Sequence, residues 1–530
     1  MKKITILAAV IASAFCTSAF AQTQSGYFLD NYVYGYRLNP AIMSEKAFFG
    51  LGVGNIDLTG KSDLGLSDFL YKNPDGNGLV TGLNKSISAE EFLANIKDAN
   101  NLAVNGGVNL ISFGARKEHK MSTFEINLRA NSAAYLPGDA FKFLKCGTEN
   151  GGSYDLSSLS ANVSSYLEIA LGRAYENQKS NFTFGFRAKF LLGLAAADIN
   201  ATKANLTINE TQASANVLAN GKLACSLGSF ATDPDGNWTI NFNQDPAAFR
   251  PAGYGGAVDL GIRWKPFKLL TITAGISDLG CMYWKYNSLA EAKGSYEFKG
   301  LEEVGPDTDV NAELDQMQKD LMKVFNLSPV SGTETSFAML PFTANAGARL
   351  RLPILSFISV GGLATYHYDA LAPWYDCRAG VTVTPFSWLS LSANTGKTSH
   401  GDVCGAALSF TFLFLNLFVS ADAYQGPLGV YAIDGVNIPY FGGVPYPVDA
   451  FNYKVNVGLT MQLGKRYKVR SSKRTTTIKG DSQEPPFIVC SRSSTLPYGQ
   501  RCSLPVRSCG CKDNQFSGTC YRLCKRELSP

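Results

Sequence analysis

Alternation of apolar and polar side chains is the dominant pattern of this 530-residue chain. In the segment 181–190, four phenylalanines share one face, whereas Arg187 and Lys189 lie on the other. Successive side chains of a strand point to opposite faces, so this segment predicts a strand with one apolar and one polar face. A soluble sandwich and a membrane barrel both contain such strands, and the segment alone does not decide between them.

The same alternation recurs along the chain and predicts about fourteen strands. Their ranges are roughly 47–58, 104–116, 121–134, 161–175, 180–194, 253–265, 269–284, 339–352, 355–368, 373–385, 387–397, 402–412, 413–424 and 451–464. The connections between them alternate between long and tight, as in a barrel with long outer loops and short periplasmic turns. The sequence therefore predicts an all-β fold, an up-and-down antiparallel transmembrane β-barrel in the bacterial outer membrane.

Charged residues in the middle of the predicted strands must face the lumen, because a charge on the lipid side costs roughly 2–4 kcal/mol near mid-membrane. The candidate lumen ligand-binding residues are Glu125, Arg129, Arg187, Lys189 and Asp259. Basic groups suit a carboxylate or phosphate head group. The favoured alternative is that these charges pair with one another across a filled interior.

A second group of basic residues lies close to the predicted tight turns. It comprises Arg263, Lys265, Arg349 and Arg351. We expect these side chains at the water-accessible periplasmic rim and assign them no ligand role.

The first 21 residues have the form of a secretory signal peptide. Lys2 and Lys3 precede an apolar stretch, and Ala19-Phe20-Ala21 is a small-x-small cleavage site that would leave Gln22 as the N-terminus. The chain is therefore predicted to be exported, with the domain order 1–21 signal peptide, 22–46 N-terminal segment, 47–464 barrel and 465–530 tail.

Two long outer loops are predicted to carry helices. Ser88 and Glu91 have the spacing of a capping box, and apolar residues recur at helical spacing in 312–327. Cys146 and Cys225 also fall in outer loops and could form a disulfide in this oxidising compartment.

The tail from 465 to 530 breaks the alternation. It holds six cysteines and 14 Lys and Arg against 4 Asp and Glu, whereas the rest of the chain holds 34 against 39. A disulfide-stapled or cysteine-ligated module is one interpretation; zinc fits poorly, because the tail has no His and its Cys spacing is unsuitable. A disordered or aberrant extension is favoured.

Short motifs resemble the FadL-like superfamily of outer-membrane long-chain fatty acid transporters, in an uncharacterised branch from Bacteroidota. They are Asn39-Pro40-Ala41 before the first strand, 65–70 (GLSDFL), 257–261 (AVDLG) and 277–280 (SDLG). The resemblance implies that residues 22–46, with Asn39, Pro40 and Ala41, form a hatch inside the barrel. It also implies passage of a hydrophobic molecule, with a lateral opening in the wall as one route. From the residues alone, Asn-Pro is equally a plain turn into the first strand.

Enzymatic activity is not expected. The chain has three His, and only His367, with Asp369 two residues on, faces the predicted lumen, where a solvated histidine is favoured over a catalytic pair. No phosphate loop, nucleotide fingerprint or metalloprotease motif is present, so no cofactor, metal or nucleic acid is predicted.

The predicted function is passive transport of small hydrophobic or amphipathic molecules through a FadL-like barrel. Its partners would be outer-membrane lipid and a hydrophobic small-molecule ligand. The alternative is an accessory barrel that holds a surface or secreted protein partner, similar to the shuttle of type IX secretion.

Overall fold

The computed structural model describes residues 24–74, 79–146, 152–177, 179–208, 213–234, 237–298, 323–324, 326–370, 373–399, 401–425, 428–431, 444–447 and 453–467. The predicted signal peptide and nearly all of the predicted tail, including its cysteines, lie outside these residues, and so does His400. Most of the helix predicted at 312–327 lies outside them as well.

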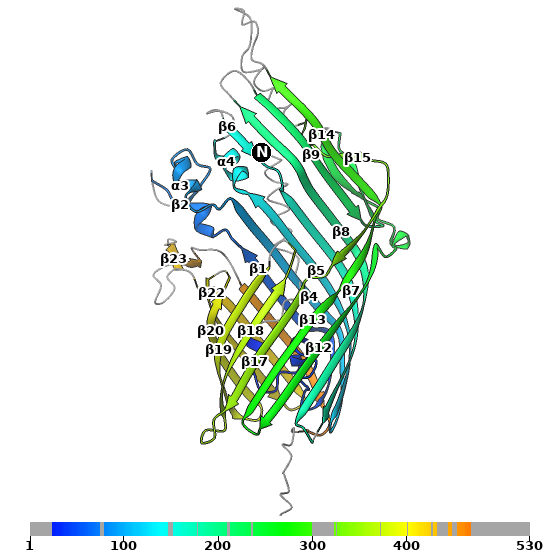
Figure 1. Cartoon of the computed structure of the whole chain (residues 1–530), viewed down its shortest axis with the longest axis vertical. Coiled ribbons are helices and arrows are strands. Elements are labelled where there is room, and N and C mark those ends of the chain that lie inside the picture. The colour runs from blue at the N-terminus through cyan, green and yellow to red at the C-terminus, as the bar shows by residue number, and fades with distance from the viewer. Residues whose placement is uncertain are drawn as a thin grey trace, which may run out of the picture. The chain divides into compact units, whose positions relative to one another are not determined.

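The main sheet closes into an antiparallel barrel of 14 strands (Figure 1). In order around the wall they are β1 (Ala47–Ser62), β4 (Ala99–Lys117), β5 (Lys120–Pro137), β7 (Ser160–Asn177), β8 (Phe182–Ile208), β12 (Gly253–Phe267), β13 (Leu270–Tyr286), β17 (Phe342–Arg351), β18 (Ile358–Tyr368), β19 (Trp374–Phe386), β20 (Leu389–Thr398), β21 (Gly401–Phe412), β22 (Leu415–Gln425) and β25 (Tyr453–Leu463). Pairing of β1 with β25 closes the ring. The all-β barrel and its fourteen strands are thus confirmed.

The two faces of each strand differ as the alternation predicts. On β8, the Phe184 and Phe190 side chains are 46% and 49% exposed, whereas Arg187 and Lys189 are 2% and 6% exposed. The phenylalanines therefore form part of the outer, lipid-facing surface, and the two cations point into the barrel. Among the described residues, no helix is long and apolar enough to cross a membrane.

The long outer connections contain more sheet than the sequence predicted. The 27-residue strand β8 runs well past the predicted end at residue 194, and it pairs there with β9 (Ala213–Ala224), which pairs with β14 (Ser288–Phe298) (Figure 1). Smaller elements complete this outer region: β6 (Gly152–Asp155), β10 (Gly228–Thr232), β11 (Trp238–Phe242), β15 (Ser328–Val330), β16 (Glu334–Met339) and the 3-10 helix η3 (Pro246–Ala248). The outer sheet has its own apolar cluster, which includes Val217, Leu223 and Phe230.

One of the two predicted loop helices is confirmed. In α3 (Ala89–Leu93), the Ser88 hydroxyl accepts a hydrogen bond from the Glu91 amide at 3.0 Å, which is the N-cap half of the predicted capping box. A second outer helix, α4 (Gly138–Cys146), was not predicted. The remaining outer elements are η2 (Leu66–Asp68) and the pairs β2 (Leu70–Lys72) with β3 (Leu79–Thr81) and β23 (Leu428–Tyr431) with β24 (Val444–Pro447). Cys146 and Cys225 are both free, so the suggested disulfide between them is not formed.

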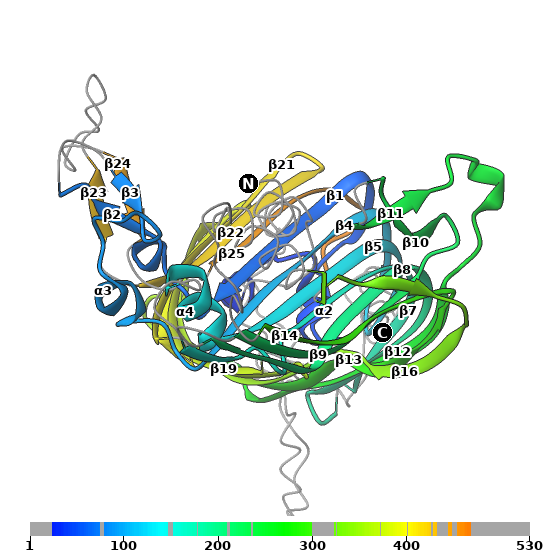
Figure 2. The same ribbon diagram turned by 90° about the horizontal axis from the view of Figure 1, so that it is seen from above.

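Residues 24–46 fill the barrel interior, and we call them the hatch (Figure 2). The hatch contains the 3-10 helix η1 (Gln24–Phe28) and the short helix α2 (Gly35–Leu38), and all residues of both are buried. Its aromatic rings pack on one another and on the wall: Tyr36 stacks on Phe48 with ring centroids 5.6 Å apart, and Tyr32 meets Phe418 edge-on at 5.0 Å. An apolar core thus lies inside the barrel, where a water-filled pore would have none.

Candidate functional site

The hatch is fixed to the wall at Asn39-Pro40-Ala41. The Asn39 side-chain amide donates to the backbone carbonyls of Ile262 on β12 and Ala274 on β13, at 3.1 and 2.9 Å. Its carbonyl oxygen accepts from the Ala41 amide at 2.9 Å, which also makes the local turn that Asn-Pro favours. Asn39 therefore does what both interpretations of the motif predicted: it forms a local turn, and it anchors the hatch to the wall.

Glycines on the wall make room for this contact. A Cβ on Gly185 would lie 2.2 Å from the Pro40 carbonyl carbon, and one on Gly261 would lie 2.1 Å from the Asn39 side-chain oxygen. Neither glycine can therefore take a side chain unless the hatch moves.

Arg37 of the hatch enters an ion network in the middle of the barrel. Its guanidinium lies 2.6 Å from the Glu125 carboxylate, which also accepts a hydrogen bond from the Tyr36 hydroxyl at 2.8 Å. Arg187 pairs with the same Glu125 and with Asp259, the latter at 2.9 Å. Glu125 and Asp259 are fully buried, so their charges depend on these partners.

The network continues towards the outer end of the lumen. Lys189 pairs with Asp259 at 2.7 Å and with Asp278, and Arg129 pairs with Glu168 at 2.7 Å and with Asp278 at 3.0 Å. Asp278 stands at an irregularity in the β12–β13 register with a φ of 65°, and its amide donates to the Asp259 carboxylate at 2.7 Å. The five predicted lumen residues therefore come together in one ion network, in which Arg129 is joined to the others through Glu168 and Asp278.

A second polar cluster surrounds the first residues of the hatch. Lys454 donates to the Gln24 side-chain oxygen at 2.6 Å, and the Gln24 amide donates to the Asp422 carboxylate at 3.1 Å. Arg378 lies 2.8 Å from Asp422 and also pairs with Asp376. The hatch is thus held by charged groups on both sides of the lumen.

A small polar cavity of about 80 Å³ separates these two clusters. Its wall includes Arg129 and Lys189 from the ion network and Lys61, His367 and Trp374 from the opposite side. Its volume is that of two or three waters, well below the roughly 300–1,000 Å³ of a typical ligand pocket. With the hatch in this position, the cavity can hold a small polar group and not a whole lipid.

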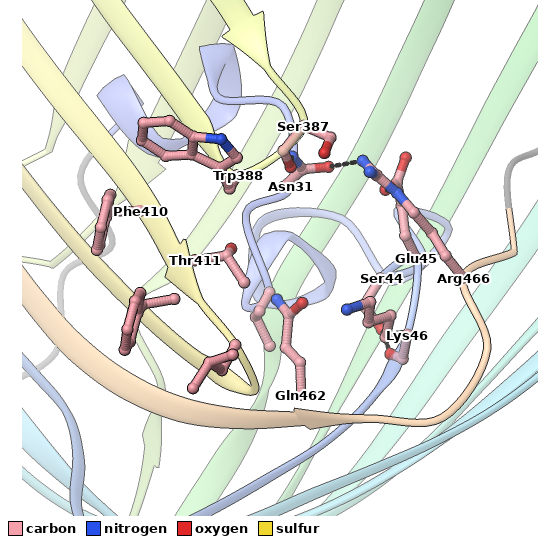
Figure 3. Close-up of a pocket in the computed structure, with 13 residues that line it drawn as sticks. Asn31, Ser44, Glu45, Lys46, Ser387, Trp388, Phe410, Thr411, Gln462 and Arg466 are labelled. Carbon is pink, nitrogen blue, oxygen red and sulfur yellow. Dashed lines mark hydrogen bonds and ion pairs between the residues drawn. The ribbon is translucent and has the colours of Figure 1, made fainter.

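Two larger cavities lie at the periplasmic end. One of about 470 Å³ lies between the hatch and the turns that join β19 to β20 and β21 to β22, where Arg466 donates to the Asn31 side-chain oxygen at 3.1 Å (Figure 3). Arg466 also pairs with Glu45. The start of the predicted tail at residue 465 therefore contacts the hatch.

The other cavity, of about 510 Å³, is lined by the basic residues assigned to the periplasmic rim. Arg349 and Arg351 pair with Asp30 of the hatch at 2.9 and 3.0 Å. Burial acts to raise the pKa of Asp30, but the two guanidiniums outweigh it and hold that pKa below its ordinary value. Arg263 departs from the expectation, because only 7% of it is exposed; it donates to the Thr183 hydroxyl at 3.2 Å.

The two histidines that the structure describes are His119 and His367, and the contacts of His367 are with Thr343 and Trp374. Nδ1 of His367 lies 2.8 Å from the Thr343 hydroxyl, and its ring stacks on Trp374 with centroids 5.3 Å apart. His367 therefore faces the lumen, as predicted. His119 lies at a tight turn near Glu118 and Glu176.

Sequence reasoning missed several members of these clusters. Glu168 follows the inward alternation of its strand and could have been found from it, whereas Arg37 lies in the hatch, where no alternation exists. Asp278 lies where the register slips, which obscures the parity of its strand. Lys61 lies beyond the predicted end of the first strand at residue 58.

Fold and site together define a closed β-barrel of the outer-membrane type whose lumen is occupied by its own N-terminal hatch. A family model described as "Family of unknown function (DUF5723)" matches residues 40–422. The chain belongs to this family. No curated protein matches it.

The structure is similar to solved structures of two toluene transporters and of a FadL homologue. The P. putida toluene transporter TodX has 9% sequence identity and a TM-score of 0.40, with 82% of this chain and 95% of that chain covered. The Ralstonia pickettii toluene transporter TbuX has 8% identity and a TM-score of 0.39, with 81% and 94% covered. A Pseudomonas aeruginosa FadL homologue has 10% identity and a TM-score of 0.35, with 83% and 96% covered.

These likenesses concern the fold alone. The closed antiparallel β-barrel expected from the sequence is confirmed by its strand pairing. The FadL-like resemblance of the motifs and the assignment to a Bacteroidota branch stay predictions.

Proposed function

We propose that this barrel is a passive conduit for small amphipathic molecules, opened by movement of its hatch. The observation that supports it most is that the segment filling the bore belongs to the chain's own N-terminus and that, besides its apolar core, exchangeable polar contacts hold it. Each such hydrogen bond contributes roughly 0.5–1.5 kcal/mol net, because water or a ligand can replace the partner. A hatch held in this way can leave and return without unfolding the wall.

We infer that the substrate has a hydrophobic part from the FadL-like motifs, and that it has a polar part from the charged groups in the lumen. Charged groups lie beside the hatch on both sides of the lumen, and the cavity above it is lined mostly by polar side chains. A purely apolar molecule would have to displace water from these groups without satisfying them, which is costly. An amphipathic molecule brings a polar group that can replace the water.

A reversible cross-link between hatch and wall tests this proposal. A Cβ placed on Gly275 would lie 3.2 Å from the Asn39 Cγ, close to the ~3 Å between a Cβ and the partner sulfur in a disulfide. The double variant Asn39→Cys/Gly275→Cys should therefore close a disulfide without moving the hatch. Liposomes containing it should take up a fluorescent dodecanoate at least tenfold more slowly when oxidised than when reduced.

The single variant Asn39→Cys is the matched control, since it loses the same amide contacts but cannot form this cross-link. Mass spectrometry of the peptide pair identifies the bond against the native cysteines. Equal uptake by the oxidised and reduced double variant would contradict a moving hatch. Uptake no faster than in protein-free liposomes, in both states and in the unmodified chain, would contradict transport itself.

A protein-holding role is the second candidate, and the outer sheet favours it. Strands β8, β9 and β14 continue beyond the barrel and bury their own apolar cluster, so they form a structured outer surface. If this surface holds a partner, deleting 209–252 should remove a co-purifying surface or secreted protein while leaving the barrel folded. Recovery of the same partner with the deletion variant would dismiss this role.

A further inference from the structure

Lys61 on β1 and Trp374 on β19 are two buried hydrogen-bond donors that face one cavity, and neither has an acceptor among the described residues. We propose that they form, together with His367, a binding site for an oxyanion group, the carboxylate or phosphate of an amphipathic molecule. This inference deepens the proposed conduit, because it assigns the group of the substrate that the lumen recognises.

The Lys61 ammonium is the first observation. Lys61 is only 6% exposed, and none of the ion pairs or hydrogen bonds formed among the described residues includes it. Its Nζ lies 3.9 Å from the centroid of the Trp374 ring, a cation–π contact that stabilises a charge but leaves its three hydrogens without an acceptor. A buried ammonium without a carboxylate is costly, and an anion from outside the chain would remove that cost.

The Trp374 indole is the second observation. Trp374 is 4% exposed, and its Nε1 hydrogen finds no acceptor among the described residues. Buried indole N–H groups usually find a partner, so an unsatisfied one marks a position that an acceptor can fill. Since Lys61, Trp374 and His367 all line the cavity of about 80 Å³, one acceptor group could serve more than one of these donors.

The charge balance around the indole is the third observation. Lys454 lies over the same ring, 3.7 Å from its centroid, and Arg378 lies nearby, whereas the carboxylates in contact with this group are Asp376 and Asp422. Arg378 contacts both carboxylates, and Lys454 contacts Gln24. Both carboxylates are thus bound to Arg378, whereas the Lys61 and Lys454 ammonium groups at the ring have no carboxylate within 4.0 Å among the described residues, so an added oxyanion would meet two cations there.

The opposite wall of the cavity does not compete for the anion. There, Arg129 and Lys189 each contact two carboxylates, so their charges are already matched. An incoming carboxylate would be repelled by Asp278 on that side and attracted by Lys61 on the other. The site is therefore on the Lys61 side.

Binding of three eight-carbon probes tests the site. Octanoate, octyl phosphate and octanol share one tail, and isothermal titration into the full chain in uncharged nanodiscs measures their affinities. We expect one or both anions to bind at least tenfold more tightly than octanol, and the better of them identifies the group. Octanol binding as tightly as both anions would overturn the proposal.

Variants locate the binding. Lys61→Met should lower the affinity for the preferred anion at least tenfold, whereas Lys61→Arg should keep it within about threefold. Lys397→Met is the matched control, because the Lys397 side chain is 84% exposed. If Lys61→Met fails to fold, Trp374→Phe removes the indole donor and keeps the ring, and it should weaken the anion and not octanol.

Unchanged anion affinity in Lys61→Met would overturn the site. Binding and transport fail separately: anion binding without uptake contradicts the conduit alone, and uptake that Lys61→Met does not slow, without measurable anion binding, contradicts this site alone.

Discussion

The buried cations on the two sides of the lumen differ in their partners. On the side of β5, β7, β8, β12 and β13, each of the four cations Arg37, Arg129, Arg187 and Lys189 contacts a carboxylate at 3.0 Å or less. On the side of β1, β19 and β25, Lys61 has no carboxylate partner among the described residues, and Lys454 binds an amide oxygen of the hatch.

This difference separates two tasks. We call the ion network around Glu125 the lock, because removing one of its members leaves another charge buried and unpaired. We call the side of Lys61 and Trp374 the receptor side, because the hydrogen-bond donors of these two residues would be satisfied by a bound ligand. We infer that the lock holds the hatch through Arg37 and that ligand binding on the receptor side releases the hatch.

The largest effect is expected from Glu125→Gln, which removes the carboxylate shared by Arg37 and Arg187. Two guanidiniums would then compete for the remaining carboxylates, and loss of one partner in a buried pair costs roughly 3–5 kcal/mol. We expect this cost to appear as release of the hatch. Single-channel conductance should show an open state that is populated at least 100-fold more often than in the unmodified chain.

Glu334→Gln is the control for this change, because it breaks a surface ion pair with Lys222. The Lys222 and Glu334 side chains are 32% and 45% exposed. Such exposed pairs contribute only about 0–1 kcal/mol, so its conductance should not change. A Glu125→Gln barrel that stays closed would show that the network is not the lock.

A smaller effect is expected from Gly261→Ala on β12. Its new Cβ would overlap the Asn39 side chain at 2.1 Å, and forcing extra atoms into a packed site costs roughly 1–3 kcal/mol. The hatch should become more sensitive to protease added from the periplasmic side. Gly256→Ala on the same strand is the matched control, because its Cβ would meet nothing closer than 3.6 Å, and equal sensitivity of the two variants would argue against the contact as an anchor.

The wall could be predicted from the sequence because alternation is a local signal. A strand must separate lipid-facing from lumen-facing residues at every second position, so Phe184 and Arg187 already carry that information. The turn between Phe412 and Leu415 likewise follows from two adjacent alternating segments. The predicted pairing of Glu125, Arg187 and Asp259 also follows from alternation. Opposite charges that point into one lumen pair with each other, because a buried charge without a partner is costly.

The receptor side could not be predicted in this way. Trp374 is an aromatic residue at a strand end, where outward interfacial packing is usual, yet it points inward. The approach of Lys61 to Trp374 joins β1 to β19, strands that are not neighbours in the wall, and no periodicity encodes a contact across the lumen. The outer extension of β8 was missed because its pattern continues without a turn signal to mark where the membrane ends.

The smallest effect concerns the periplasmic end, where Asp30 ties the hatch to Arg349 and Arg351. Because the pKa of Asp30 is held below its ordinary value of 3.8, its charged form stabilises the docked hatch above that pH, and this contribution is lost as the pH falls through the lowered pKa. Asp30 is partly exposed, so we expect about 1 kcal/mol. Protease protection of the hatch should be unchanged from pH 7 to pH 5 and should fall below about pH 4. Asp30→Asn should show the lower protection already at pH 7 and a smaller acid step. If the variant and the unmodified chain follow the same pH profile, the contact with Asp30 does not hold the hatch, and the lock lies wholly in the network around Glu125.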